Sequence, residues 1–192
     1  MEIIIASNNR HKIREIAGVL KESVKLVSMV DAGIEDDIPE NEDSLEGNAL
    51  EKARYVHNVT GLNVFADDTG LEVEALDGEP GVHSARYAGP GKDPEKNIVR
   101  LLNELKGKKN MKARFRTVIA LIYNNDEYLF EGIVNGRIIT EKRGNNGFGY
   151  DPIFIPENNT RTFAEMSSER KNMISHRAIA ISKLHEFLKS RT

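Results

Sequence analysis

Two adjacent carboxylates, Asp67 and Asp68, follow an apolar run from Leu62 to Ala66 and precede a Thr69-Gly70 pair. Neighbouring residues of a strand point to opposite faces, so both acids can meet one ligand only if the strand ends there and the chain turns. Carboxylate oxygens at a strand end suit a hard divalent cation such as Mg2+, which favours phosphate-bearing substrates. A solvated Asp-Asp-Thr-Gly turn is the alternative, because Asp and Gly are ordinary turn residues.

Two more charged residues, Glu40 and Lys52, could act with this pair, but their local sequence alone does not assign them that role. Glu40 lies in an acidic, irregular segment over residues 31–43 and could complete a metal site, although most acids in such a run are solvated. Lys52 lies about two turns into a predicted helix, where a solvated lysine is the default. Neither residue carries a prediction by itself.

A polar run, Ser7-Asn8-Asn9-Arg10-His11-Lys12, separates a predicted strand from a predicted helix. This arrangement directs backbone N–H groups and the positive end of a helix dipole at one point, which suits a phosphate. Lys12 is a cation in the first helical turn, where the dipole disfavours it by up to about 1 kcal/mol unless an anion lies nearby. The run is not a Walker P-loop, because the Gly-rich stretch and the Gly-Lys-Ser/Thr ending are missing. A plain N-cap with exposed basic residues is the alternative.

A second basic cluster, Arg170, Lys171, His176 and Arg177, lies where the last helix starts, near position 167 or 175. Cations at a helix start oppose the dipole, which favours a cluster that binds an anion or a nucleobase. Arg can donate a planar fork of N–H groups to an acceptor edge. A solvated basic helix face is the alternative.

Two aromatic side chains and a carboxylate share one Gly-flexed loop, Phe148-Gly149-Tyr150-Asp151-Pro152. Aromatic residues in a loop can stack on a nucleobase while the acid and the backbone contact its edge. They can equally form a small local core, so the loop alone leaves both interpretations open.

The elements that must position these residues indicate an α/β fold. In the first half, strands are expected at 3–6, 24–29 and 62–66, with helices to about residue 20 and over 44–59, ending near Gly61. In the second half, a short strand is expected at 71–76, a helix at 94–105 and a hairpin of two strands at 113–123 and 128–139, turning at 124–126. The segments 78–91 and 143–163 are expected to be loops, the first with a short helix, and a helix ends the chain near residue 188. Loops as long as 143–163 are usually functional in a compact domain.

Composition excludes several classes of protein. The chain has 192 residues, a formal net charge of −3 and no cysteine, so it has no disulfide framework, thiolate metal site or Cys nucleophile. The small net charge gives no global field for nucleic acid or membranes, and neither partner is expected. The N-terminus lacks the basic start and long apolar core of a signal peptide, and no stretch reaches the length of a membrane span. We therefore expect a cytoplasmic protein.

The motifs occur in an order that resembles the inosine/xanthosine triphosphate pyrophosphatase family, also called the HAM1-like family. The matching segments are Ser-Asn-Asn-x-x-Lys-x-x-Glu-Ile at 7–16, Ala-Asp-Asp-Thr-Gly-Leu at 66–71, Pro-Gly-Val-His-Ser-Ala-Arg-Tyr-Ala-Gly at 80–89, Gly-Phe-Gly-Tyr-Asp-Pro-Ile-Phe at 147–154, and Phe-Ala-Glu-Met followed by Lys-Asn-x-x-Ser-His-Arg-Ala at 163–178. Each motif alone is modest, but all of them in this order, over nearly the whole chain, are highly specific.

This resemblance implies one domain over residues 1–192, with an elongated mixed α/β sheet flanked by helices and a cleft between two lobes. It also implies a Mg2+-dependent enzyme that hydrolyses ITP, dITP and XTP to the monophosphate and pyrophosphate, and so cleanses the nucleotide pool. Members of the family are usually homodimers. The nearer alternative is a Maf-like pyrophosphatase for modified nucleotides. A non-catalytic nucleotide- or RNA-binding protein is the other.

The site residues implied by the resemblance fall into three groups. Metal ligands are Glu40 and Asp68, and Asp68 is also the proton acceptor, supported by Asp67. Phosphate contacts are Ser7, Asn9, Lys12 and Lys52, within a substrate-binding run that includes Asn8, Arg10 and His11. Other substrate and base contacts are Thr69, Arg86, Phe148, Gly149, Tyr150, Asp151, Lys171, His176 and Arg177. Many bacterial members carry Glu-Asn-Ala where this chain has Gly47-Asn48-Ala49, so no role is predicted for a carboxylate at position 47.

Overall fold

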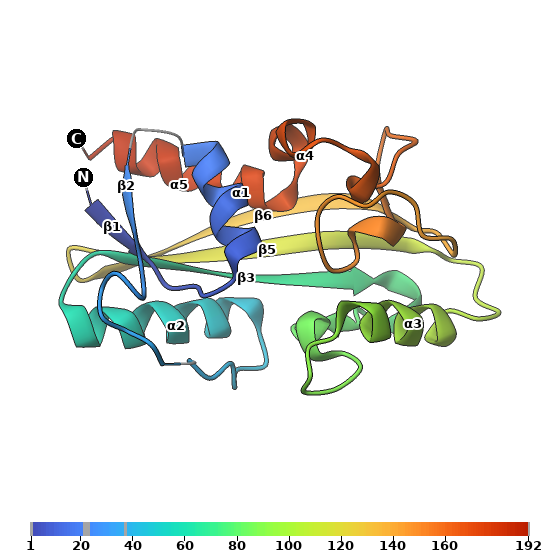
Figure 1. Ribbon diagram of the computed structural model, residues 1–192, viewed down its shortest axis with the longest axis horizontal. Helices are drawn as coiled ribbons and strands as arrows, with labels where there is room; N and C mark the ends of the chain where they lie inside the picture. Colours follow the sequence, from blue (N-terminus) through green and yellow to red (C-terminus); the bar gives the residue numbers. More distant parts are fainter. Residues whose placement is uncertain (1, 21–23, 37, 192) are drawn as a thin grey trace. The chain divides into compact units, whose positions relative to one another are not determined.

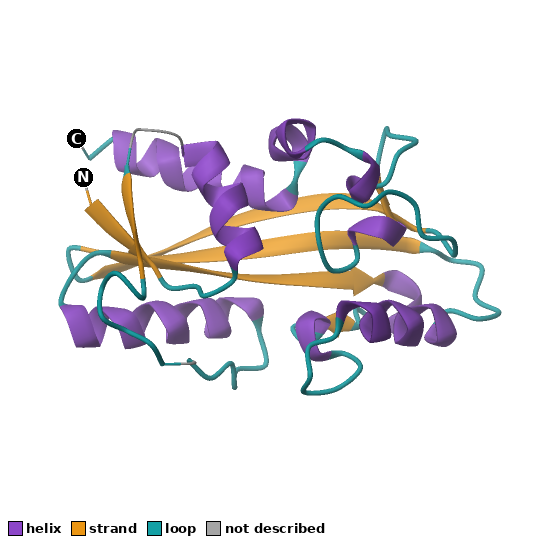
Figure 2. Ribbon diagram, viewed as in Figure 1, coloured by secondary structure: helices purple, strands orange, loops and turns teal. Residues whose placement is uncertain are grey.

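The computed structural model describes residues 2–20, 24–36 and 38–191 (Figures 1 and 2). Position 37 of the predicted acidic segment lies outside the described residues. The helices are α1 (Arg10–Leu20), α2 (Leu45–Thr60), α3 (Pro94–Glu104), α4 (Ser168–Ile174) and α5 (His176–Lys189). The strands are β1 (Glu2–Ile5), β2 (Lys25–Ser28), β3 (Val64–Val73), β4 (Pro80–Gly81), β5 (Lys112–Tyr123), β6 (Asp126–Ile138) and β7 (Phe154–Pro156). No helix among these residues is both long and apolar enough to span a bilayer.

The sheet is mixed, as the family resemblance implied. Within the described residues the strands run in the order β2-β1-β3-β5-β6-β7, and β4 pairs with β3. β1 is parallel to β2, with Ile3 opposite Leu26, and parallel to β3, with Ile5 opposite Phe65. β4 and β7 pair antiparallel with β3 and β6. The β1–α1–β2 connection is the parallel βαβ unit that the alternating pattern of the first half indicated.

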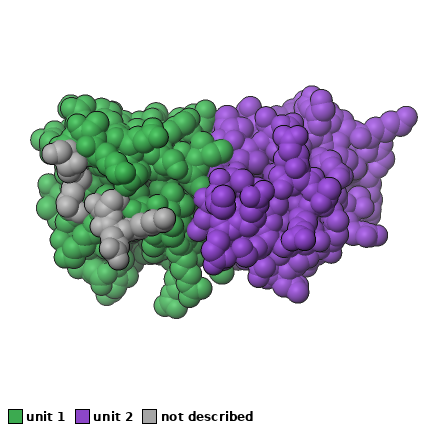
Figure 3. All heavy atoms as spheres, turned by 90° about the horizontal axis from the view of Figure 1, so that it is seen from above, with its two compact units in different colours: residues 1–68, 117–132, 177–192 green, residues 69–116, 133–176 purple. Residues whose placement is uncertain are grey.

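The chain divides into two compact units, coloured separately in Figure 3. Unit 1 comprises residues 1–68, 117–132 and 177–192, and unit 2 comprises residues 69–116 and 133–176. Each unit has its own apolar cluster: Phe65, Ile119 and Leu184 belong to the cluster of unit 1, and Phe115 and Phe154 to that of unit 2. The single domain, the elongated outline and the cleft between lobes stay predictions.

Several local predictions are confirmed because their chemistry is local. Ser44 caps α2 by accepting the Gly47 N–H, and Gly61 ends that helix in the left-handed conformation with φ 67°. Asn124 and Asn125 turn the β5–β6 hairpin with φ values of 52° and 70°, a backbone that Asn tolerates well. Pro94 begins α3 directly after the capping side chain of Asp93.

The predicted end of a strand at Ala66 is wrong. β3 continues without a break through Asp67, Asp68, Thr69 and Gly70 to Val73, and residues 74–76 form a short 3-10 turn rather than strand. A buried strand can carry two adjacent acids when charged partners from other elements neutralise them on both faces. Those partners are remote in sequence, so local turn chemistry gave the wrong answer.

Two further predictions of elements need correction. The segment predicted as a loop over 143–163 contains the strand β7 and the 3-10 turn Asp151–Ile153. The predicted last helix is two helices, because Ser167 caps α4 and Ser175 separates α4 from α5. Both alternative starts, near 167 and near 175, are therefore real helix starts.

Candidate active site

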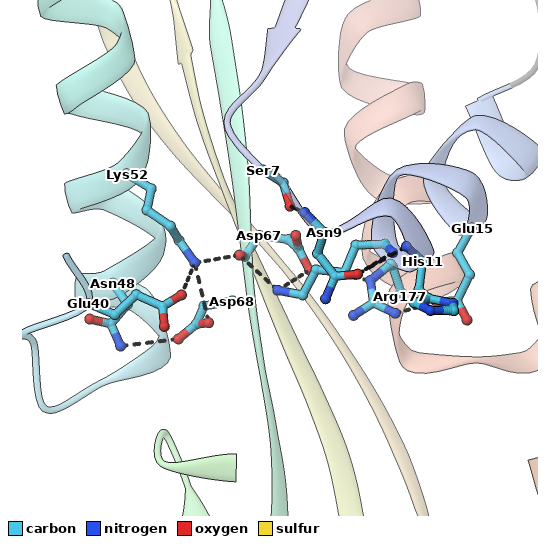
Figure 4. A network of polar contacts seen from close by, with 11 residues as sticks. Ser7, Asn9, His11, Glu15, Glu40, Asn48, Lys52, Asp67, Asp68 and Arg177 are labelled. Carbon is cyan, nitrogen blue, oxygen red and sulfur yellow. Dashed lines mark hydrogen bonds and ion pairs between the residues drawn. The ribbon is translucent and has the colours of Figure 1, made fainter. Parts of the chain in front are cut away.

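The carboxylates of Asp67 and Asp68 lie on opposite faces of β3, because consecutive side chains of a strand alternate (Figure 4). Within unit 1, α1 and α5 cover one face of the sheet and α2 covers the other (Figure 1). The Asp67 side chain therefore meets residues of α1 and α5, and the Asp68 side chain meets residues of α2. The two acids do not converge on one point, as the predicted turn would have required.

The face that carries Asp67 holds a mostly buried chain of ion pairs. Asp67 Oδ2 lies 3.1 Å from Lys12 Nζ and 3.3 Å from Arg177 Nε. Arg177 also donates to Glu15, which lies one turn along α1 from Lys12. The Asp67 side chain is 0% exposed and that of Arg177 is 2% exposed. Two cations and two carboxylates thus balance each other around a buried centre, while Lys12 is 16% and Glu15 14% exposed.

This balance determines the acidity of Asp67. Burial alone would raise the pKa of its carboxyl group, but the positive charges of Lys12, Arg177 and Lys52 together outweigh burial. The pKa of Asp67 is therefore held well below its ordinary value. In turn, burial would lower the pKa of Arg177, but Asp67 and Glu15 outweigh it and raise that pKa. Asp67 is consequently a firmly ionised anchor for the two cations.

The face that carries Asp68 has a different charge balance. Lys52 Nζ lies 2.8 Å from Glu40 Oε1 and 3.4 Å from Asp68 Oδ1. Asn48, one turn before Lys52 on α2, donates to Asp68 Oδ2 at 3.2 Å and accepts the Glu42 N–H. Here one cation faces two carboxylates. The Glu40 side chain is 23% exposed, so this face is open to solvent on the Glu40 side.

Asp68 therefore differs in acidity from its neighbour. Burial raises the pKa of Asp68, and the charge of Glu40 adds to the rise, whereas Lys52, Lys12 and the Asn48 hydrogen bond oppose it. The net result is a pKa above the ordinary aspartate value. For Lys52, burial would lower the pKa, but Asp68, Glu40 and Asp67 outweigh it, so the ammonium is stabilised. Asp68 is the better proton acceptor of the two acids near neutral pH.

A backbone carbonyl joins the two faces. The Asp67 carbonyl oxygen accepts from Lys52 Nζ at 2.8 Å and from Lys12 Nζ at 3.4 Å. β1 pairs with β3 only as far as Phe65, and β4 joins β3 only at Leu71 and Glu72. Among the described residues, neither strand pairs with β3 between those positions, so lysine side chains can take the place of a strand donor at Asp67.

The run from Ser7 to Lys12 begins α1 as predicted, but three of its backbone amides already donate to side chains of the run. Ser7 Oγ accepts the Asn9 N–H at 3.2 Å, and Asn9 Oδ1 accepts the N–H groups of His11 at 3.0 Å and Lys12 at 3.3 Å. Asn8, Arg10 and His11 are exposed, and Ser7 is half-buried. The anion that Lys12 was predicted to need lies within the chain, at Asp67.

Three of the predicted base contacts form a second cluster, within unit 2. Lys171 Nζ lies 2.6 Å from Asp151 Oδ2, with both side chains nearly inaccessible, and 5.1 Å from the centre of the Phe148 ring. The same Asp151 oxygen accepts the Phe148 N–H at 2.8 Å. Gly147 has φ 73°, and a side chain there would begin 2.0 Å from Asp151 Oδ2. Glycine at 147 thus allows the loop to close around the Asp151–Lys171 pair.

The remaining predicted residues of unit 2 lie outside this ion pair. Tyr150 is buried and donates through its hydroxyl to the Ser84 carbonyl at 2.9 Å, and burial raises its pKa. The His176 ring stacks on Phe115 with ring centres 4.6 Å apart. Three further predicted contacts complete the set: Gly149 has a left-handed φ of 62°, Thr69 is half-buried in β3, and Arg86 is half-buried in the 3-10 turn Ser84–Arg86.

Comparison with known proteins decides the family. The Ham1 family model matches residues 3–187. The chain belongs to the Ham1 family. A protein of Porphyromonas gingivalis named dITP/XTP pyrophosphatase is 53% identical over 188 residues, which are 97% of each chain. One of Flavobacterium psychrophilum with the same name is 52% identical over 99% of this chain and all of its own.

Solved structures of the Ham1 family have the same fold. The Staphylococcus aureus Ham1 protein superposes with a TM-score of 0.91, at 40% identity and complete coverage of both chains. The nucleoside-triphosphatase, or dITP/XTP pyrophosphatase, of Mycobacterium abscessus superposes with a TM-score of 0.78 at 42% identity, covering 96% of this chain and 98% of its own. The predicted family and the mixed α/β fold are confirmed.

Two residues of this Ham1 family site were not predicted from the sequence. Glu15 holds Arg177, and Asn48 holds Asp68. The signal for Glu15 was its position one turn from Lys12 within the first motif. The signal for Asn48 was an amide on the apolar face of α2, four residues before Lys52, where a fully buried polar group needs a partner. Neither signal names the partner, which comes from another part of the chain.

The place of Arg177 changes the interpretation of its charge. A cation at a helix start led us to expect an acceptor, with the C6 oxygen of a base as the candidate. The acceptors that the structure provides are the carboxylates of Asp67 and Glu15. Direct contact between Arg177 and a base stays a prediction, and the structure gives it no separate support.

Proposed function

We propose that this protein hydrolyses the triphosphates of non-standard purines, ITP, dITP and XTP, to the monophosphate and pyrophosphate. The observation that carries this proposal is the Asp68 face of β3, where two carboxylates and one ammonium leave an excess of negative charge. A protein that only binds phosphates has little use for such an excess. The names and the high identity of the Ham1 relatives support the same activity.

The residues on this face fit a divalent cation. Among the described residues no group of three or more His, Cys, Asp and Glu side chains could hold a metal. Mg2+ commonly uses only one or two carboxylates and completes its shell with water and substrate phosphates. We propose Glu40 and Asp68 as its ligands, because they are the two carboxylates that share Lys52. When bound there, Mg2+ neutralises phosphate charge and lowers the pKa of bound water.

Asp68 is the catalytic carboxylate in this proposal. Hydrolysis at the α-phosphorus needs an acceptor for the proton of the attacking water. The raised pKa of Asp68 favours that role, whereas the lowered pKa of Asp67 opposes it. Asp67 serves instead as the anchor that places Lys12. Lys12 and Lys52 then offer ammonium groups to the phosphates, with Ser7 and Asn9 shaping the start of α1 beside them.

Base recognition is proposed for unit 2 residues and for Arg177. Phe148 supplies an aromatic face, and the loop from Phe148 to Asp151, with Lys171 and His176, supplies donors and acceptors; Thr69 and Arg86 are further substrate contacts. Hypoxanthine and xanthine present an oxygen at C6, whereas adenine presents an amino group. A buried donor that faces adenine would lose its partner, at a cost of about 1–3 kcal/mol.

The decisive test is pyrophosphate release from ITP, XTP, GTP and ATP, with Mg2+ or with EDTA. The proposal expects rapid Mg2+-dependent release from ITP and XTP, and slow release from GTP and ATP. Turnover of modified pyrimidine or methylated nucleotides in place of ITP would indicate a Maf-like enzyme. Tight binding of ITP without any pyrophosphate would indicate a non-catalytic nucleotide-binding protein.

We also propose that the protein acts in the cytoplasm as a homodimer and that residues 1–192 behave as one domain. The support is the Ham1 family membership and the full-length match to its relatives. Sedimentation equilibrium at micromolar concentration checks the dimer, and a single cooperative transition in urea checks the domain. A monomer, or two separate transitions, would contradict the respective statement.

A further inference from the structure

The ammonium of Lys52 is bound by the same two carboxylates that we propose as metal ligands. Its Nζ lies 2.8 Å from Glu40 Oε1 and 3.4 Å from Asp68 Oδ1 (Figure 4). A third contact, at 2.8 Å, goes to the Asp67 carbonyl oxygen. A lysine ammonium has three N–H donors, so these three oxygens use all of them. Lys52 is therefore fixed in place and is not a flexible surface charge.

The position of Lys52 has an electrostatic consequence. The side chains of Lys52 and Asp68 are each 9% exposed, so charges there interact more strongly than in water. Lys52 offsets one of the two negative charges and holds Glu40 and Asp68 together. A divalent cation on the same carboxylates would bring two positive charges close to the ammonium. Because like charges repel, binding of the cation to these carboxylates weakens their ion pairs with Lys52, and those ion pairs in turn weaken binding of the cation.

We propose that Lys52 is a positioning residue that competes with the divalent metal for Glu40 and Asp68. The metal binds tightly only when a triphosphate offers Lys52 other oxygens and so releases the two carboxylates. Competition itself concerns only the protein and the metal. The part played by the triphosphate rests on the proposed function.

Such competition couples the two ligands. If a triphosphate draws Lys52 away from Glu40 and Asp68, it strengthens metal binding, and by linkage the metal strengthens triphosphate binding by the same factor. Lys52 can keep its hydrogen bond to the Asp67 carbonyl oxygen during this exchange, because that oxygen belongs to the backbone of β3 and is not one of the proposed metal ligands. The result is a site that loads metal and nucleotide together rather than metal alone.

Binding of Mn2+ alone, with free Mn2+ measured by electron paramagnetic resonance, tests the competition. Mn2+ prefers the same oxygen ligands as Mg2+. The Lys52→Met variant should bind Mn2+ at least about tenfold more tightly than the wild type, a modest share of the Coulomb energy of two charges about 4 Å apart. Adding Asp68→Asn to that variant should remove the gain. An affinity equal to or below that of the wild type would overturn the proposal.

Lys12→Met is the matched control. It removes the same charge from the same unit, but Lys12 pairs with Asp67 on the opposite face of β3, at 3.1 Å. Its Mn2+ affinity should rise less than that of Lys52→Met, since the ion pair of Lys12 is with Asp67 and the charge of Lys12 acts on Asp68 less than that of Lys52 does. An equal gain in both variants would show a general effect of net charge and would overturn the specific role of Lys52.

The wild type supplies a second readout that does not depend on folding of a variant. In a Mg2+ titration followed by nuclear magnetic resonance of the lysine ammonium groups, the Lys52 signal should move along the Mg2+ binding curve, and the Lys12 signal should move less. Saturating Mg2+ that leaves the Lys52 signal unchanged would overturn the competition. Turnover of ITP by the wild type is measured separately, so failure of the proposed function and failure of this inference are distinguishable.

Discussion

The two faces of β3 in unit 1 carry the same residue type one position apart, yet they are built for different tasks. On the Asp67 face, two cations and two carboxylates pair with one another: Asp67 is 0%, Arg177 2%, Glu15 14% and Lys12 16% exposed. On the Asp68 face, two carboxylates share one ammonium, and Glu40 remains 23% exposed. Charge balance, rather than residue type, separates the two faces.

This comparison shows how a buried carboxylate can be assigned to structure or to chemistry. A balanced and mostly buried ion cluster costs much to disrupt, and its charges are already paired within the protein. An unbalanced cluster has an excess of negative charge, which a metal site needs. That excess also helps to raise the pKa of a buried carboxyl group such as Asp68, which a proton acceptor needs. Substitutions on the two faces should therefore affect different measurements.

The largest effect is expected from Asp68→Asn. Asn is nearly isosteric, but it cannot accept a proton or bind Mg2+ as an anion, so pyrophosphate release from ITP should fall at least about 10³-fold. The melting temperature should change little, because Lys52 keeps its contacts with Glu40 and the Asp67 carbonyl. Substantial turnover by this variant would move the catalytic role away from Asp68 and would break the comparison.

Asp67→Asn should act mainly on stability. It leaves the buried charges of Lys12 and Arg177 without their shared carboxylate, and removal of one partner from a buried ion cluster costs about 3–5 kcal/mol. Urea unfolding measures the free energy, with the exposed Asp126→Asn as the control that should change it little. A loss below about 1 kcal/mol would mean that Asp67 is not the anchor of this face.

Stability as a function of pH should show opposite signs for the two acids. The pKa of Asp67 is lowered in the folded protein, so its contribution to stability is present above the unfolded value of about 3.9 and is lost as the pH falls below it. The pKa of Asp68 is raised, so the folded protein binds more protons at that group, and its contribution falls as the pH rises from about 3.9 through the folded pKa.

Urea unfolding of the wild type and of both Asn variants between about pH 3 and pH 7 tests these signs, since the window brackets the ordinary aspartate pKa. The deficit of Asp67→Asn relative to the wild type should shrink toward acid pH. The relative stability of Asp68→Asn should improve toward neutral pH. The same pH trend in both variants would contradict the separation of the two faces.

What the sequence predicted, and what it did not, follows from the range of the interactions. The ends of α2 were predictable because Ser44 and Gly61 act on backbone groups of their own turn. The course of β3 was not, since the partners of Asp67 and Asp68 come from α1, α2 and α5. The three-residue strand β7 is too short for a periodic signal. The site residues were named by resemblance, but their division between two faces appears only in three dimensions.

The smallest effect we predict concerns Asn48→Ala. Asn48 donates to Asp68 Oδ2, and this hydrogen bond opposes the rise of the Asp68 pKa, so its removal should raise that pKa further. If Asp68 is the proton acceptor, the acid limb of the pH profile of kcat/KM with ITP should move to higher pH. The control is Asn97→Ala, because Asn97 is likewise a buried helical amide that accepts one N–H and donates one hydrogen bond, but to backbone groups of unit 2. Both variants should lose about 1–3 kcal/mol of stability, while only Asn48→Ala should shift the acid limb. If the acid limb shifts in neither variant or in both, the pH profile does not report the pKa of Asp68. That result would contradict the chemical role of this face of β3.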